Sequence, residues 1–303
     1  MLVGPTAVGK TAVALALAEL MPIEVVSADS RQIYRRLDIG TAKPTKRERR
    51  RVPHHGLDLV DPGQRYSAGR FALEGSTWVG EIRSRDRLPV VVGGTGLYIR
   101  ALAEGLFREP TLAPSRRSDL QAWLDRMQGS ELVRWAARLD PEFKGGGRQR
   151  AARAIELALL TGQPLSHWQR VARAEGTIEP WYVRLTVPRP VLHRRIEVRA
   201  REMLQRGLVE EVAAVLAEGH PAATPGLDAV GVREAVQYLH GQRERETIPD
   251  AIAASTRQYA KRQETWFRHQ LKGTVLTLDA TRRPAEIARE IAEAWNQNSD
   301  SAI

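Results

Sequence analysis

Cysteine is the residue type that this sequence lacks altogether. Its absence excludes disulfide bonds, cysteine-ligated metal sites and a cysteine nucleophile. No apolar run approaches the length of about 18 residues that a membrane-spanning helix needs, so we expect no membrane partner. Both absences suit a protein of the reducing cytoplasm, which is where we expect this one to act.

Acidic residues are in short supply. The 303 residues include 46 Lys and Arg against 36 Asp and Glu, which gives a formal net charge of +10. Such a surplus favours a polyanionic partner, because each phosphate that a protein neutralises releases condensed counterions. Most of the surplus is arginine, whose planar fork suits phosphates and base edges. With 42% hydrophobic residues, the chain can still bury a globular core.

Residues 4–11, GPTAVGKT, match the phosphate-loop pattern G-x-x-x-x-G-K-[ST]. The glycines let main-chain N–H groups turn toward phosphate oxygens, Lys10 supplies a positive charge, and Thr11 can hold Mg²⁺. The helical stretch that follows adds its N-terminal dipole. Only three residues precede Gly4, fewer than the ~5 of an ordinary strand. We therefore expect the first strand to begin before residue 1.

Four apolar runs separated by helical stretches predict strands: residues 23–30, 88–96, 181–187 and 273–280. This alternation favours a parallel α/β sheet of the P-loop NTPase-like kind, with helices on its faces and ligands at the carboxyl ends of its strands. The phosphate loop, Asp29 and the turn at 93–96 would meet at that edge. ATP binding is implied by the loop motif alone, because no acid follows the strand at 88–92. A diphosphate fits such a loop equally well.

Residues 110–178 differ from the rest of the chain, because successive stretches with helical apolar spacing occur there without a convincing strand. Proline and glycine residues bracket the segment. We predict a helical insertion here, with residues 1–109 and 179–303 forming the P-loop α/β core. Arginines are frequent at its exposed positions. A solvated helix surface explains these arginines as well as RNA contact does.

Residues 250–270 contain no Gly or Pro and predict one long helix. Residues that recur every seven positions predict its buried stripe: Ile252, Tyr259 and Trp266. Cations lie together on another face: Arg257, Lys261 and Arg268. Stacked cations repel one another unless an anion lies between them, so we favour an anion-binding face. A solvent-exposed face is the alternative, since Glu264 between the cations could weaken their repulsion. The adjacent pair His54 and His55 does not predict a metal site, since neighbouring side chains diverge.

Taken in order, the motifs of the chain resemble those of the tRNA dimethylallyltransferase family: GPTAVGKT, SADSRQIYRRLDIGTAKPT, PHHGLDLVDP, YSAGRF, VVVGGTGLYIRAL and STRQYAKRQETWFR. That family has an α/β P-loop fold whose helical insertion grasps the tRNA anticodon arm. It transfers a dimethylallyl group from dimethylallyl diphosphate to N6 of the adenosine 3′ of the anticodon, position 37, and releases diphosphate. The resemblance implies this reaction here, with Mg²⁺ as cofactor, and we expect a monomer.

The resemblance also implies roles for individual residues. Asp29 would be the general base that accepts the N6 proton, Thr95 would bond near the reacting adenine, and Thr11 would hold Mg²⁺. The donor diphosphate would contact the loop and two arginines: Gly4, Thr6, Ala7, Val8, Gly9, Lys10, Thr11, Arg233 and Arg257. The residues that would contact tRNA are Asp29, Ser30, Arg31, Gln32, Thr95, Arg117, Gln149, Arg150 and Arg153.

Other functions fit part of the pattern. An adenylate isopentenyltransferase shares the phosphate loop and the aspartate, but its free nucleotide substrate needs no arginine-rich insertion. A small-molecule P-loop kinase could use Asp29 to accept a proton from its substrate, and the missing acid after the strand at 88–92 is a mild objection to it. A basic RNA-binding protein with a vestigial phosphate loop would leave Lys10, Thr11 and Asp29 without a role.

Overall fold

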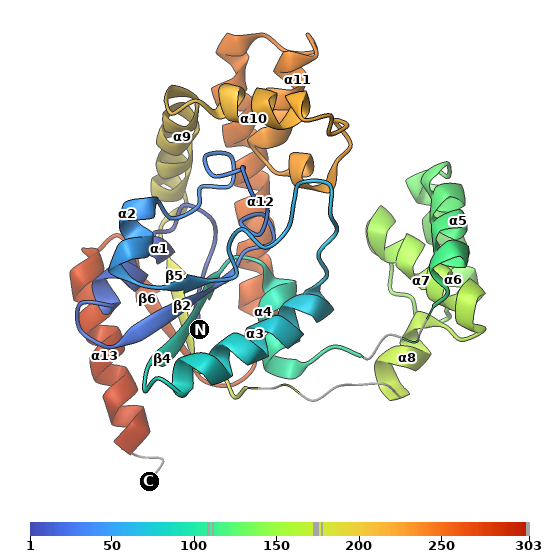
Figure 1. Ribbon diagram of the computed structural model, residues 1–303. Helices are drawn as coiled ribbons and strands as arrows, with labels where there is room; N and C mark the ends of the chain where they lie inside the picture. Colours follow the sequence, from blue (N-terminus) through green and yellow to red (C-terminus); the bar gives the residue numbers. More distant parts are fainter. Residues whose placement is uncertain (108–109, 111, 172–175, 177, 301–303) are drawn as a thin grey trace. The chain divides into compact units, whose positions relative to one another are not determined.

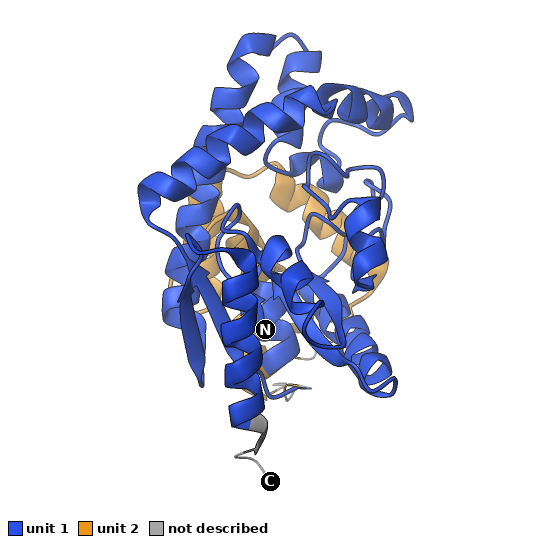
Figure 2. Ribbon diagram, turned by 90° about the vertical axis from the view of Figure 1, so that its left-hand side faces the viewer, with its two compact units in different colours: residues 1–103, 178–303 blue, residues 104–177 orange. Residues whose placement is uncertain are grey.

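The computed structural model describes residues 1–107, 110, 112–171, 176 and 178–300 (Figure 1). The chain divides into two compact units (Figure 2). Unit 1 comprises residues 1–103 and 178–303, and unit 2 comprises residues 104–177. The sequence placed the start of the insertion at residue 110, since prolines mark a turn there. Unit 1 ends earlier because α4 (Gly96–Glu104) ends at Glu104. Residue 109, the predicted end of the core segment, lies outside the described residues.

A six-stranded parallel sheet forms the centre of unit 1, in the order β3-β2-β4-β1-β5-β6. The four predicted strands are confirmed, and two short strands join them. The six are β1 (Leu2–Val3), β2 (Ile23–Ala28), β3 (His54–His55), β4 (Leu88–Gly93), β5 (Tyr182–Thr186) and β6 (Val275–Asp279). Sequence analysis missed β3, because two polar histidines carry no apolar strand pattern. They pair with Val25 and Val26 of β2.

Helices cover both faces of the sheet. The described α-helices of unit 1 are α1 (Lys10–Leu17), α2 (Lys46–Arg51), α3 (Ala68–Arg83), α4, α9 (Arg189–Gln205), α10 (Leu208–Ala217), α11 (Val232–Leu239), α12 (Ile248–Gln270) and α13 (Pro284–Asp300). Alternate residues of a strand enter different cores: Val25 packs with residues of α1 and α13, whereas Val26 packs with residues of α3 and α4. Strands buried on both faces read as continuous apolar runs, which is why sequence analysis found them.

The short strand β1 positions the phosphate loop. It lies between β4 and β5, and its residue Val3 pairs with Gly93 and Arg184. Leu2 and Val3 are both buried. The loop therefore leaves the interior of the sheet at the carboxyl edge, next to the ends of β4 and β5.

The predicted long helix is α12, which the structure confirms, but its buried stripe is only partly as predicted. Ile252 is buried, together with Ala260, Gln263 and Phe267. Tyr259 and Trp266 are only partly buried. Both aromatic rings lie at the turn that follows β4. An added Cβ on Gly96 would lie 2.3 Å from the Trp266 ring, and Tyr259 forms a hydrogen bond with Thr95.

The described elements of unit 2 are all helices: α5 (Pro114–Asp125), α6 (Gly129–Leu139), α7 (Arg148–Thr161) and α8 (Leu165–Val171). Its core contains Leu124, Leu132 and Ile155. Asp140 is buried and accepts hydrogen bonds from the main-chain N–H and the hydroxyl of Ser166, which ties α8 to the end of α6. Among the described residues, no helix is both long enough and apolar enough to cross a bilayer.

The close approach of β2 and β4 can be tested at Gly93. An added Cβ would lie 2.1 Å from the carbonyl oxygen of Ala28, so the strands would have to separate. We expect Gly93→Ala to lower the free energy of unfolding, measured by urea denaturation, by about 1–3 kcal/mol. The matched control is Gly80→Ala in α3, where nothing lies within 4 Å of the new methyl group. It should stabilise the protein by up to about 1 kcal/mol. Equal stability of the two variants would contradict this packing.

Candidate active site

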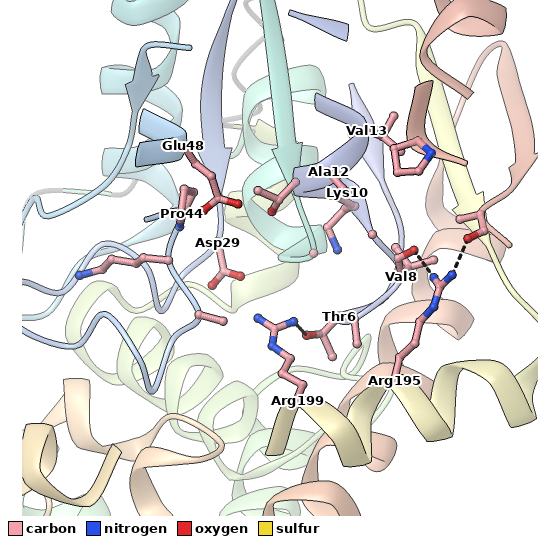
Figure 3. Close-up of a pocket in the computed structure, with 18 of the residues that line it drawn as sticks. Thr6, Val8, Lys10, Ala12, Val13, Asp29, Pro44, Glu48, Arg195 and Arg199 are labelled. Carbon is pink, nitrogen blue, oxygen red and sulfur yellow. Dashed lines mark hydrogen bonds between the residues drawn. The ribbon is translucent and has the colours of Figure 1, made fainter. Parts of the chain in front are cut away.

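A cavity of about 870 Å³ opens beside the phosphate loop at the carboxyl edge of the sheet (Figure 3). Most lining residues come from the loop, the end of β2, the segment 41–48 and α9, and others come from the turn after β4, α12 and residues 280–287. The predicted site residues that line it are Thr6, Ala7, Val8, Gly9, Lys10, Thr11, Asp29 and Gln32. The structure thus brings the proposed phosphate cradle and the proposed base into one cavity.

The backbone of the phosphate loop turns sharply before α1. Ala7 and Gly9 have φ values of 63° and 112°, in the left-handed region. Gly9 is the N-cap residue of α1 and makes no side-chain capping bond. The first N–H groups of α1 are therefore offered to the cavity, where the helix dipole favours an anion.

Gly4 and Thr6 were predicted to contact the donor diphosphate, but their contacts in the structure are different. Gly4 does not line the cavity; an added Cβ there would lie 2.7 Å from the carbonyl oxygen of Leu185. Its role is to let the loop pass close to β5. The N–H group of Thr6 is already bonded, because it donates to Oε1 of Gln263 at 2.8 Å. That N–H group is therefore not free for a phosphate, although the Thr6 side chain lines the cavity.

Gln263 joins the two glycine-rich turns of the site. Its Nε2 donates to the carbonyl oxygen of Gly94 at 2.8 Å, while its Oε1 accepts from Thr6. The side chain is buried in α12. One amide therefore fixes the phosphate loop relative to the turn after β4. Sequence analysis had quoted this residue within a motif without assigning it a role.

Lys10 is folded back over the phosphate loop. Its Nζ donates to the carbonyl oxygens of Gly4 and Pro5, at 2.8 Å each. Burial lowers the pKa of Lys10 to about 8, nearby Asp29 opposes this shift, and Arg199 adds to it. The charge is thus held beside the cavity at some cost, which an anion next to Nζ would offset.

Arginines of α9 complete the cavity, and sequence analysis missed them. Arg195 donates to the carbonyl oxygens of Val8 and Ala280, at 2.8 Å each. Arg199 lies across from Asp29 and contacts the hydroxyl of Thr6 at 3.5 Å (Figure 3). Burial lowers the pKa of Arg199, and it forms no ion pair within the described part of the chain. The spacing of four between these arginines in LHRRIEVRAREML places them on one helix face and could have identified them.

Asp29 and Thr95 lie just beyond the carboxyl ends of β2 and β4. Oδ1 of Asp29 accepts from the N–H group of Arg31 at 2.9 Å, which orients the carboxylate. The N–H group of Thr95 donates to Ala28 at 3.1 Å, and its Oγ1 accepts from the N–H group of Ser30 at 3.0 Å. Thr95 is not among the residues that line the cavity. Burial raises the pKa of Tyr259, the hydrogen-bond partner of Thr95, to about 12, so this phenol stays neutral.

Arg233 and Arg257, predicted to clamp the donor, do not line the cavity. Arg233 reaches Glu234 at 3.1 Å and Asp228 at 3.9 Å. Arg257 pairs with Glu197 at 3.2 Å on another side of α9. Arg195 and Arg199 of α9 line the cavity where these two were expected, while the cavity residue that α12 supplies is Gln263.

Two of the residues predicted to contact tRNA in unit 1 make structural contacts. Gln32 lines the cavity, and its side chain bonds to Ser27 and Ala42 at 3.0 Å and 3.2 Å. Arg31 donates to the carbonyl oxygen of Pro225 at 3.0 Å and lies 3.5 Å from Asp228.

In unit 2, Arg117 and Arg153 both pair with the buried carboxylate of Glu156. Gln149 and Arg150 are exposed at the start of α7, and Arg150 lies over the Phe143 ring. Arg117 is exposed as well, with 46% of its side chain accessible, but its guanidinium is held by Glu156.

The position of Lys10 predicts how anion binding depends on pH. A bound anion favours the charged amine, so the pKa of Lys10 rises on binding. The affinity for the anion is then greatest below the pKa that Lys10 has in the unliganded protein, about 8. It falls as the pH rises above that value. We expect the affinity for inorganic diphosphate, measured by calorimetry across this range, to fall more steeply for the unaltered protein than for Lys10→Arg. Parallel curves would show that Lys10 does not contact the anion.

Two family models match the chain. The IPP transferase model matches residues 32–270, and the isopentenyl transferase model matches residues 1–54. The tRNA dimethylallyltransferase of Halorhodospira halophila is 46% identical over 285 residues, 92% of each chain. That of Geobacter metallireducens is 43% identical over 273 residues, 88% of this chain and 87% of the relative.

Solved structures agree with these matches. The full-length tRNA isopentenylpyrophosphate transferase of Bacillus halodurans has a TM-score of 0.70 and 33% identity, covering 99% of this chain and 97% of that one. A eukaryotic dimethylallyltransferase acting on tRNA has a TM-score of 0.81 and 26% identity, covering 98% of this chain and 79% of that one. The resemblance seen in the motifs is thereby confirmed, and the chain belongs to the IPP transferase family.

Proposed function

We propose that this chain transfers a dimethylallyl group from dimethylallyl diphosphate to N6 of adenosine 37, just 3′ of the anticodon of tRNA. Membership of the IPP transferase family makes the chain a transferase, and its relatives are named tRNA dimethylallyltransferases. The observation that carries the proposal is a single cavity that contains a phosphate loop, the α9 arginines and the carboxylate of Asp29. These groups match the two ends of the reaction, a diphosphate that departs and an amine that loses a proton.

The donor diphosphate would lie at the N-terminus of α1. Its negative charge grows as the C1–O bond of the dimethylallyl group breaks. Lys10, Arg195 and Arg199 line the same cavity and would stabilise that charge without having to reorganise, because main-chain carbonyls and the Thr6 hydroxyl already hold them.

Mg²⁺ is the cofactor that the phosphate loop implies. It keeps several waters and takes one or two protein oxygens together with phosphate oxygens. Thr11, the second residue of α1, lines the cavity with its carboxylate neighbours Asp29 and Glu48. No cluster of three or more metal-binding side chains occurs in the described ranges, so phosphate oxygens would have to supply most of the ligands. The Thr11 hydroxyl therefore fits Mg²⁺, which when bound would add positive charge beside the diphosphate.

Asp29 would act on the acceptor. N6 of the adenine attacks C1 of the dimethylallyl group, and the proton that N6 then loses passes to Asp29. Oδ1 of Asp29 is engaged by the N–H group of Arg31, while Oδ2 has no hydrogen-bond partner among the described residues. That oxygen can accept the proton. The adenine would have to leave the anticodon stack to reach the cavity.

Unit 2 would contribute contacts to the anticodon arm of tRNA. The exposed side chains of Gln149 and Arg150 are the strongest candidates, since they lie at the start of α7 without an ion pair among the described residues. Arg117 of α5 pairs with Glu156 of α7 and so fastens the two helices, whereas Arg153 pairs with Glu156 within α7.

The function is tested by label transfer from radiolabelled dimethylallyl diphosphate, in the presence of Mg²⁺, to an anticodon stem-loop. A stem-loop with uridine in place of the target adenosine is the control, and AMP is offered in a parallel tube. Label in the adenosine stem-loop alone is expected. Label in AMP would instead identify a free-nucleotide isopentenyltransferase, a class that also uses a phosphate loop. Label in neither acceptor would overturn the proposal.

The role of Asp29 as general base predicts that its substitution slows the chemical step without weakening stem-loop binding. Asp29→Asn keeps the shape of the side chain but removes the proton acceptor, so we expect the rate of label transfer to fall by about 10²–10⁴-fold. The affinity for the stem-loop, measured by fluorescence anisotropy, should stay within about twofold of the unaltered value. The control is Asp86→Asn, an exposed turn residue outside the cavity, which should change neither quantity. A loss of affinity equal to the loss of rate would make Asp29 a binding residue.

A further inference from the structure

One wall of the active-site cavity is a segment with no helix or strand, to which the proposed function gives no role. Residues 41–45 of this segment line the cavity. We call residues 37–45 the strap. Figure 3 shows Pro44 of the strap on the same side of the cavity as Asp29. The strap therefore borders the acceptor end of the cavity, where the adenine would lie.

The carboxylate of Glu211, in α10, holds the first part of the strap. Its Oε2 accepts from the N–H groups of Asp38 and Ile39, at 2.7 Å and 2.8 Å. Its Oε1 accepts from the N–H group of Gly40 at 2.8 Å. Successive main-chain N–H groups that converge in this way form a concavity suited to an anion. Because the acceptor is charged, these bonds are stronger than bonds between neutral groups.

Gly40 lets the strap approach the helices that hold it. An added Cβ at this position would lie 2.5 Å from Cγ2 of Val232 in α11 and 3.4 Å from Oε1 of Glu211. A side chain there would push the strap away from the carboxylate. The position of the strap is thus set by α10 and α11, two helices that contribute no residue to the cavity themselves.

Further contacts hold the part of the strap that lines the cavity. Nε2 of Gln32 donates to the carbonyl oxygen of Ala42 at 3.2 Å. The buried ammonium of Lys43 donates to carboxylate oxygens of Asp38 and Asp58, at 2.7 Å and 2.6 Å. Ala42 has a φ of 49°, in the left-handed region that costs free energy for a residue other than glycine. The anchors therefore hold a conformation that the strap alone would not favour.

We propose that Glu211 is a positioning residue of the transfer reaction. It does not line the cavity, and it acts by holding the strap so that the adenine lies within reach of Asp29. This role rests on the proposed function, because it concerns the acceptor of that reaction. A small displacement of a reacting group slows a reaction strongly, so loss of the anchor lowers kcat. Diphosphate binding is unaffected, because Gln263 and Arg195 hold the phosphate loop independently of the strap.

The test compares Glu211→Gln, which keeps one acceptor oxygen, with Glu211→Ala, which keeps none. The matched control is Glu210→Gln in the same turn of α10, whose carboxylate lies 3.4 Å from the exposed Arg245. Label transfer is divided by the number of diphosphate-binding sites, which calorimetry counts. We expect kcat for each site to fall about 10- to 100-fold in Glu211→Ala and by less in Glu211→Gln. The KM for the stem-loop and the affinity for diphosphate should stay within about twofold of the control.

Hydrogen exchange tests the anchor without relying on activity. The amides of Asp38, Ile39 and Gly40 should exchange about 10- to 100-fold faster in Glu211→Ala than in the control. Unchanged exchange would overturn the anchor. A number of diphosphate-binding sites that falls in step with total label transfer would overturn the positioning role, because it would mean that folded protein is lost and nothing else.

The positioning role and the proposed function can fail separately. If the unaltered protein transfers label and both Glu211 variants transfer it as the control does, the positioning role alone is overturned. If the unaltered protein transfers no label, the proposed function is overturned, and the positioning role falls with it.

Discussion

Positive charge that forms no ion pair within the described residues is the constraint on which the active-site cavity depends, although Asp29 and Glu202 act on it at longer range. Lys10 and Arg199 are partly buried beside the cavity, and burial lowers the pKa of each. Carbonyl oxygens of the loop hold Lys10, and the Thr6 hydroxyl touches Arg199, but neither contact neutralises a charge. Keeping cations in such a place costs free energy in the unliganded protein. A diphosphate in the cavity offsets that cost, so the charge arrangement favours the ligand that leaves during the proposed reaction.

The parallel sheet delivers these groups to one place. Because all strands run in one direction, the phosphate loop after β1, Asp29 after β2 and the turn after β4 emerge at the same edge. Gln263 then connects the loop to the turn from α12, and Gly93 lets β2 and β4 approach closely. The main chain and the buried amide of Gln263 thus fix the geometry of the site. The side chains of Lys10, Asp29 and the α9 arginines would carry out its chemistry.

Local motifs were enough to predict the phosphate loop, the four longer strands, the position of Asp29 and the family. The α9 arginines could not be found in the same way, because what matters is which helix lies across from the loop. The motifs led us to expect Arg233 and Arg257 in the cavity, yet both pair with carboxylates outside it. Tyr259 and Trp266 have the seven-residue spacing of a buried stripe. Their rings instead contact the turn after β4, at the edge of the site. Tertiary neighbours, which a motif does not encode, account for each difference.

The most direct test of the central claim is the affinity of Arg199→Gln for inorganic diphosphate, measured by calorimetry beside Arg201→Gln. Arg201 lies two positions further along α9, is exposed and does not line the cavity. A hydrogen bond to a charged group contributes about 1.5–3 kcal/mol. The account therefore predicts that Arg199→Gln binds diphosphate about 10- to 100-fold more weakly, while Arg201→Gln binds it as the unaltered protein does. Equal affinity in both variants would contradict the claim that uncompensated charge in this cavity holds the diphosphate.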